Sequence, residues 1–193
     1  MIKDRKIYHI LIVEDNEGDQ LIVEDLLRET ILLPDIVQAV SFKSAKEKLA
    51  SYHSKFDVIL LDISLPDKSG KELVEEILQL APSIPVIVLT GFTDMDFSIK
   101  SISQGVIDYL LKDEMNATSL YKSIIYSIER KKYFTAVKES EQRYSDLFNL
   151  SPQPMWVFEI DTLKFVQVNN AMVELYGYSE DELFSMTLRD IKM

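Results

Sequence analysis

The chain has 193 residues, a formal net charge of −11 and no cysteine. The acidic balance argues against nucleic acid as a partner of this segment, and the lack of cysteine argues against disulfides and thiolate metal sites. The apolar runs are far shorter than the ~18 residues that cross a bilayer, and no apolar stretch with a cleavage site follows the N-terminus. We therefore expect a cytoplasmic location and no membrane contact for this segment.

Strand and helix patterns alternate through the first part of the chain. Amphipathic stretches such as DQLIVEDLLRE and SGKELVEEILQLA predict helices. The apolar runs between them predict five strands, at Ile7–Val13, Ile36–Val40, Asp57–Leu61, Pro85–Leu89 and Val106–Leu111. This alternation is typical of an α/β fold with a parallel sheet and helices on both faces. Five such units fill residues 1–130, which is an ordinary size for one domain.

The stretch from Ala117 to about Leu150 contains no Gly or Pro and predicts one long helix. Apolar residues recur in it at a 3-4 spacing that Glu141 interrupts, namely Phe134, Val137, Tyr144 and Phe148. Two interpretations remain open. Either the helix ends the first domain and runs into a linker over residues 131–150, or the 117–150 helix pairs with the same helix of a second copy of the chain in a homodimer.

The pattern changes after Ser151-Pro152. PMWVFEID and FVQVNN predict two strands joined by a hairpin turn, and NAMVELYGYSEDELFSM predicts helical structure with a break at Gly177. Residues 151–193 therefore form a small α+β segment with little apolar surface to close a core. We expect its aromatic residues to need a partner surface: Trp156, Phe158, Phe165, Tyr176 and Tyr178.

Polar residues stand where four of the predicted strands end. They are the pair Glu14-Asp15, then Asp62, Thr90 and Lys112. Each has an ordinary explanation when taken alone, as a first-turn acid, a turn aspartate, a strand threonine or a solvated lysine. Because the carboxyl ends of parallel strands share one edge of a sheet, the four positions are expected to converge there.

The chemistry of these side chains points to phosphoryl transfer. Asp15 and Asp62, with Glu14 directly or through water and a backbone carbonyl near Ser64, would hold Mg²⁺. Asp62 is then the nucleophile that accepts the phosphoryl group. Lys112 would balance the phosphoryl charge, and the Thr90 hydroxyl would donate a hydrogen bond to a phosphoryl oxygen.

These motifs resemble the receiver domain of two-component response regulators, over roughly Ile7 to Arg130. The resemblance is carried by LIVEDN, LLDISLPDKSG, IVLTG and DYLLKD. It implies a flavodoxin-like, doubly wound sheet of order 2-1-3-4-5, and a histidine kinase or phosphotransfer protein as the phosphoryl donor. It also implies that a receiver promotes its own phosphorylation and dephosphorylation, with no separate catalytic domain in this segment. Tyr109 matches the aromatic that changes rotamer when Thr90 moves, although a half-buried strand tyrosine is an equal interpretation.

The tail resembles the N-terminal part of a PAS sensor domain, through SEQRYSDLFNLSPQPMWVFEID, FVQVNNA and YGYSEDEL. Asn169 or Asn170 is expected to cap the following helix. The resemblances together imply a receiver over residues 1–130, a helical linker over 131–150 and a partial PAS-like domain over 151–193. Such an order suggests part of a larger phosphorelay signalling protein, for example a sensor histidine kinase.

Two other classes of function remain. One is a protein-interaction domain that works without phosphorylation. The loss of an acid or of Lys112 would favour it, and none of these residues is lost. The other is a phosphatase with an aspartate nucleophile. Such enzymes resemble one another in carrying D-x-D on the first strand, whereas here Asp62 stands at the end of the predicted third strand and is followed by Ile63-Ser64.

Overall fold

The computed structural model describes residues 3–52, 55–91 and 105–191. They form two compact units, Met1–Thr135 and Ala136–Met193, and the boundary lies inside one helix. The helix expected between the fourth and fifth strands lies outside the described residues. Among the residues that are described, no helix combines the length and the apolar character needed to cross a bilayer.

The first unit is built on a parallel sheet of five strands. They are β1 (His9–Val13), β2 (Asp35–Ala39), β3 (Val58–Asp62), β4 (Val86–Thr90) and β5 (Asp108–Leu111). The strands lie in the order β2-β1-β3-β4-β5, and every neighbouring pair is parallel. This confirms the predicted flavodoxin-like order. Asp62 and Thr90 are the last residues of their strands rather than the residues that follow them.

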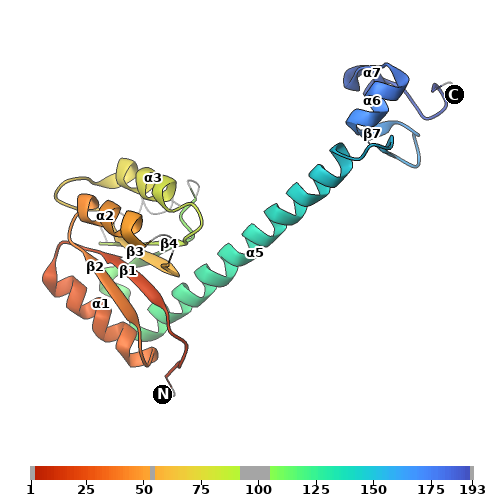
Figure 1. Ribbon diagram of the computed structural model, residues 1–193. Helices are drawn as coiled ribbons and strands as arrows, with labels where there is room; N and C mark the ends of the chain where they lie inside the picture. Colours follow the sequence, from red (N-terminus) through yellow and green to blue (C-terminus); the bar gives the residue numbers. More distant parts are fainter. Residues whose placement is uncertain (1–2, 53–54, 92–104, 192–193) are drawn as a thin grey trace. The chain divides into compact units, whose positions relative to one another are not determined.

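Helices cover both faces of this sheet because its strands are apolar on both sides. All residues of β3 and β4 are buried. Alternate residues of the strands face α2 (Phe42–Tyr52) and α3 (Gly70–Leu80) on one side, and α1 (Glu17–Thr30) on the other (Figure 1). The first turns of α5 (Ala117–Asn149) join α1 on its side through Leu120, Ile124 and Ile128. Two apolar layers therefore hold the strand ends in fixed positions.

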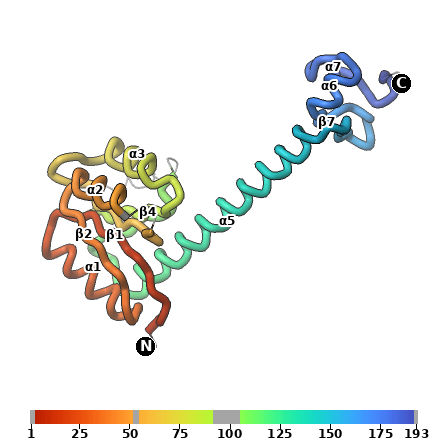
Figure 2. The backbone as a smooth tube through the Cα atoms, in the orientation of Figure 1, coloured from red at the N-terminus to blue at the C-terminus, as the bar shows by residue number. Residues whose placement is uncertain are grey.

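The second unit contains a two-stranded antiparallel sheet and two short helices. Figure 2 traces its backbone at the blue end of the chain. The elements are β6 (Trp156–Phe158), β7 (Phe165–Val168), α6 (Asn170–Tyr176) and α7 (Glu180–Ser185). Gly177 ends α6 with a φ of 74°, as the sequence predicts, and Ser179 and Glu182 form a reciprocal capping box at the start of α7.

This segment has a small core of its own, contrary to the expectation that its aromatics need a partner surface. Phe165 is buried with Val168, Met172 and Leu183, and Phe158, Tyr176 and Tyr178 pack against them. The reason is that β7 and α7 close on each other, which strand patterns alone do not reveal. Trp156 remains 38% exposed.

Asn169 joins this core to the end of α5. Its side chain is fully buried and accepts hydrogen bonds from the backbone N–H groups of Met155 (2.9 Å) and Met172 (3.0 Å). Its amide donates to the carbonyls of Phe148 and Gln153, both at 2.9 Å. Asn169, and not the exposed Asn170, is therefore the cap of α6.

Candidate functional site

Three acidic side chains gather where β1 and β3 end. One carboxylate oxygen from each of Glu14, Asp15 and Asp62 lies within 4.8 Å of the others. Glu14 and Asp62 are buried and Asp15 is exposed, so the cluster has one side open to water. Carboxylate oxygens with room for several waters are the donor set that Mg²⁺ requires. The residues present therefore fit a magnesium ion.

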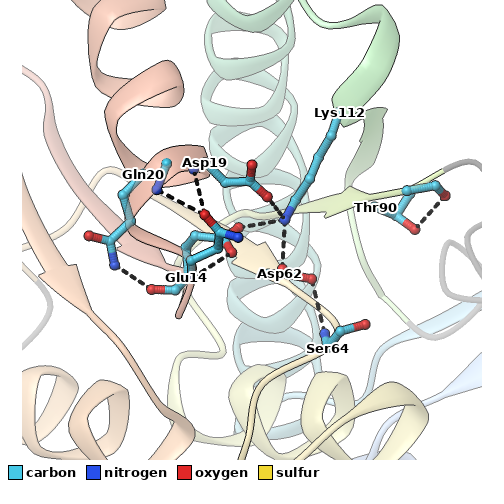
Figure 3. Close-up of polar contacts among 10 residues, drawn as sticks. Glu14, Asp19, Gln20, Asp62, Ser64, Thr90 and Lys112 are labelled. Atoms are coloured by element: carbon cyan, nitrogen blue, oxygen red, sulfur yellow. Dashed lines mark hydrogen bonds and ion pairs between the residues drawn. The ribbon is translucent and has the colours of Figure 1, made fainter.

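Lys112 projects into this acidic cluster from the first residue of the short 3-10 helix η2 (Lys112–Glu114), directly after β5 (Figure 3). Its ammonium lies 2.7 Å from Glu14 Oε2, 2.7 Å from Asp62 Oδ2 and 2.8 Å from Asp19 Oδ2. The lysine side chain is only 19% exposed. The solvated-lysine interpretation is therefore wrong, and Lys112 is the central cation of the site.

Burial sets the charge balance of the cluster. Removal from water raises the pKa of Glu14 to about 7, and the Asp62 carboxylate adds to this effect, while the Lys112 ammonium opposes it. For Lys112, burial acts to lower the pKa, but hydrogen bonds to Asp19, Asp62 and Glu14 outweigh burial and hold the pKa above its ordinary value. The lysine therefore stays charged at neutral pH, whereas Glu14 is poised to gain a proton.

The loop after β3 orients the Asp62 carboxylate. The backbone N–H of Ser64 donates to Asp62 Oδ1 over 3.0 Å (Figure 3). Gly70 N–H closes the loop on the carbonyl of Ile63 at 2.8 Å, and Gly70 takes a φ of 63°, which favours glycine. Asp62 is thus held at both oxygens, by a backbone N–H at one and by Lys112 at the other.

Thr90 and Tyr109 lie apart from these ion pairs. The Thr90 hydroxyl is buried and donates to the carbonyl of Gly91 at 3.2 Å, and Figure 3 shows it to one side of the Asp62–Lys112 contact. Tyr109 pairs with Val88 in the sheet and packs, half-buried, against the core on the α2 and α3 side. The structure therefore brings Glu14, Asp15, Asp62 and Lys112 together and leaves Thr90 beside them.

Asp19 and Gln20 also bond to residues of the site, although the strand-end pattern does not predict them. Asp19 bonds to Lys112, and the Gln20 amide donates to the backbone carbonyl of Glu14. A signal was present in Asn16, whose side chain caps α1 by accepting from the N–H groups of Gly18 and Asp19. Such a cap directly after the acid pair places Asp19 in the first turn of a helix that begins at the site.

Known proteins share these features. Residues 10–125 match the family described as response regulator receiver domain, and residues 142–192 match a PAS domain family. Transcriptional regulatory protein ZraR of Klebsiella oxytoca is 32% identical over 107 residues, which cover 53% of this chain and 22% of that protein. Response regulator protein PilR of Pseudomonas aeruginosa is 36% identical over 103 residues, which cover 52% of this chain and 22% of that protein.

A receiver domain from Clostridium thermocellum has a similar solved structure. It is 28% identical, with a TM-score of 0.59, and the match covers 66% of this chain and 98% of that one. The chain spans about a fifth of the length of ZraR and of PilR.

Proposed function

We propose that this chain, which belongs to the response regulator receiver domain family, accepts a phosphoryl group on Asp62 and transmits the change to an attached PAS-containing signalling protein. The observation that supports this most is the contact of Lys112 with Asp62 at 2.7 Å inside a cluster of acids that fits Mg²⁺. The donor is a histidine kinase or a phosphotransfer protein. Its phosphorylated histidine would lose the phosphoryl group to the aspartate.

In this reaction one oxygen of Asp62 forms a bond to phosphorus as the bond from phosphorus to the donor nitrogen breaks. The donor imidazole leaves with the electron pair. A Mg²⁺ ion bound by Glu14, Asp15, Asp62 and the Ser64 carbonyl would neutralise charge on the phosphoryl oxygens. Lys112 supplies a second positive charge at the same place, and the Ser64 N–H keeps the Asp62 carboxylate oriented.

Thr90 and Tyr109 are the proposed switch. Thr90 ends β4 beside the site, and its hydroxyl would give up the 3.2 Å bond to the neighbouring Gly91 carbonyl when it donates to a phosphoryl oxygen. Tyr109 lies on the adjacent strand β5 and is half-buried, and we infer that its side chain changes rotamer when Thr90 moves. A local charge change that biases a two-state element is the physical basis of such a switch.

The middle of α5 supports a homodimer. Every residue from Lys132 to Tyr144 is exposed, and these residues include Tyr133, Phe134 and Val137. Phe134, Val137 and Tyr144 keep the 3-4 spacing that helix pairs use, and therefore suit a second copy of the same helix. Phe148, the last position of this pattern, is buried within its own chain. Sedimentation equilibrium of the wild type and of Phe134→Glu/Val137→Glu tests this. A wild type that stays monomeric at all concentrations contradicts the dimer.

Phosphorylation itself is tested with acetyl phosphate and Mg²⁺. Wild-type protein is expected to gain one phosphoryl group on Asp62, seen by mass spectrometry as an alkali-labile adduct that is lost in Asp62→Asn. Wild-type protein that gains no adduct, or an adduct that persists in Asp62→Asn, contradicts the assignment. Glu72→Gln, an exposed acid on α3, is the matched control and should be phosphorylated like the wild type.

A further inference from the structure

Lys112 has no hydrogen left for a new partner. An ammonium group carries three donors. All three are used, by Glu14, Asp62 and Asp19, over distances of 2.7 to 2.8 Å. A phosphoryl group on Asp62 adds three strong acceptor oxygens next to this ammonium. For Lys112 to bond one of them, it must release one of its present carboxylates.

Asp19 is the partner that is released most easily. Glu14 is fully buried and Asp62 nearly so, and both belong to the cluster that fits Mg²⁺. The Asp19 side chain is 37% exposed and lies outside that cluster, so water can replace the lysine as its partner at little desolvation cost.

The position of Asp19 is set independently of any metal. Its backbone N–H donates to Asn16 Oδ1 at 3.1 Å, in the cap that starts α1. This cap holds the residue in the first turn of the helix, and the carboxylate reaches Lys112 from there (Figure 3). The side chain itself takes no part in the cap, so its charge can be removed without losing the helix start.

We propose that Asp19 is a positioning residue that holds the Lys112 ammonium in the unphosphorylated state and competes with the phosphoryl group for it. This inference rests on the proposed function. In the phosphorylated state Lys112 exchanges Asp19 for a phosphoryl oxygen, and Asp19 turns to water. Asp19 therefore weakens the phosphorylated state relative to the resting state, and sets how long the acyl phosphate lasts.

Beryllofluoride, which mimics the phosphoryl group on an aspartate, provides the test. With Mg²⁺ present, Asp19→Asn is expected to bind beryllofluoride about three- to tenfold more tightly than wild type in calorimetric titration, because the competitor is gone. The acyl phosphate formed from acetyl phosphate should last longer by a similar factor. Asparagine keeps the size of the side chain and the backbone cap.

Glu17→Gln is the matched control. Glu17 lies in the same first turn of α1 and is exposed, and the substitution removes the same charge. It should change beryllofluoride affinity by less than about twofold, since exposed charges at a distance are screened. If Asp19→Asn and Glu17→Gln change beryllofluoride affinity equally, only the overall negative charge near the site matters. That result would overturn the inference.

A double-mutant cycle with Lys112→Met shows whether Asp19 acts through the lysine. The effect of Asp19→Asn should disappear in the Lys112→Met background, both in beryllofluoride affinity and in metal-free melting temperature. An effect that persists without the lysine overturns the inference while leaving phosphorylation of Asp62 intact. Wild-type protein that binds no beryllofluoride would instead overturn the proposed function, and this inference with it.

Discussion

The carboxylate of Asp67 accepts a hydrogen bond of 2.8 Å from the backbone N–H of Phe42, at the first residue of α2. A second bond, of 2.9 Å, comes from the N–H of Lys43. Asp67 lies in the loop that follows Asp62 and contains Ser64. The loop that follows Asp62, the proposed phosphoacceptor, is therefore bonded at its tip to the start of a helix. These two N–H bonds, of which the one from Lys43 has the larger effect, hold the pKa of Asp67 below its ordinary value.

Asp67→Ala should lower the melting temperature by several degrees, because the backbone N–H groups of Phe42 and Lys43 at the start of α2 lose their acceptor. It should also weaken Mg²⁺ binding, since the loop that contains Ser64 loses two of the bonds that hold it. Differential scanning calorimetry and Mg²⁺ titration measure the two effects. Asp25→Ala, an exposed acid on α1, is the control and should change neither. Normal Mg²⁺ affinity in Asp67→Ala would show that the fastening does not reach the site.

Asp15→Ala should weaken Mg²⁺ binding by at least about tenfold, because it removes one of the clustered oxygen ligands. Without metal the same variant should melt no lower than wild type, since one of three repelling carboxylates is gone. Titration calorimetry and metal-free melts check the two statements. Equal Mg²⁺ affinity in wild type and variant would show that the acidic cluster is not the metal site.

Lys112→Ala should impair phosphorylation and also destabilise the metal-free protein by about 1–3 kcal/mol, because it leaves buried carboxylates without their cation. Added Mg²⁺ should recover part of this stability. Lys71→Ala, an exposed lysine on α3 paired with Glu75, should have little effect on either property. A Lys112→Ala protein that phosphorylates at the wild-type rate would contradict the role given to this residue.

Mg²⁺ affinity should depend on pH through Glu14. With its pKa raised to about 7, Glu14 must lose a proton before it can bind the ion, so affinity rises with pH up to about 7 and then levels off. The stability of the metal-free protein should fall as the pH rises from 4.5, the ordinary pKa of Glu14, to about 7. In this range the folded state binds a proton that the unfolded state has lost. Titrations and melts across this range, with Glu14→Gln as the control, test both signs. A pH-independent affinity would contradict the raised pKa.

Asn169→Ala should destabilise the second unit by about 1–3 kcal/mol, since it removes the partners of the buried Phe148 carbonyl and of the part-buried Met155 N–H and Gln153 carbonyl. Trp156, the only tryptophan, lies next to Met155 in β6, so its fluorescence reports unfolding of this unit. Asn170→Ala is the control, because that side chain is exposed. Identical melts for the two variants would show that the buried amide contributes nothing.

The fold of the first unit could be predicted from the sequence for a local reason. Apolar runs of strand length alternate with amphipathic helical stretches, and parallel strands place their carboxyl ends at one edge. Glu14, Asp15, Asp62 and Lys112 were found in this way, because each stands next to the end of an apolar run. Gly177 likewise predicted the break between α6 and α7, since a left-handed residue ends a helix.

Other features depend on contacts between distant parts of the chain, and only the tertiary structure decided them. The bond from Asp19 to Lys112 spans 93 residues and exists because the cap of α1 and the end of β5 meet at the same sheet edge. The choice of Asn169 over Asn170 as cap follows from the turn that brings Phe148 and Gln153 to its amide. The pKa of Glu14 also depends on the tertiary structure, because it is raised first by burial and then by the Asp62 carboxylate, which is far away in the sequence.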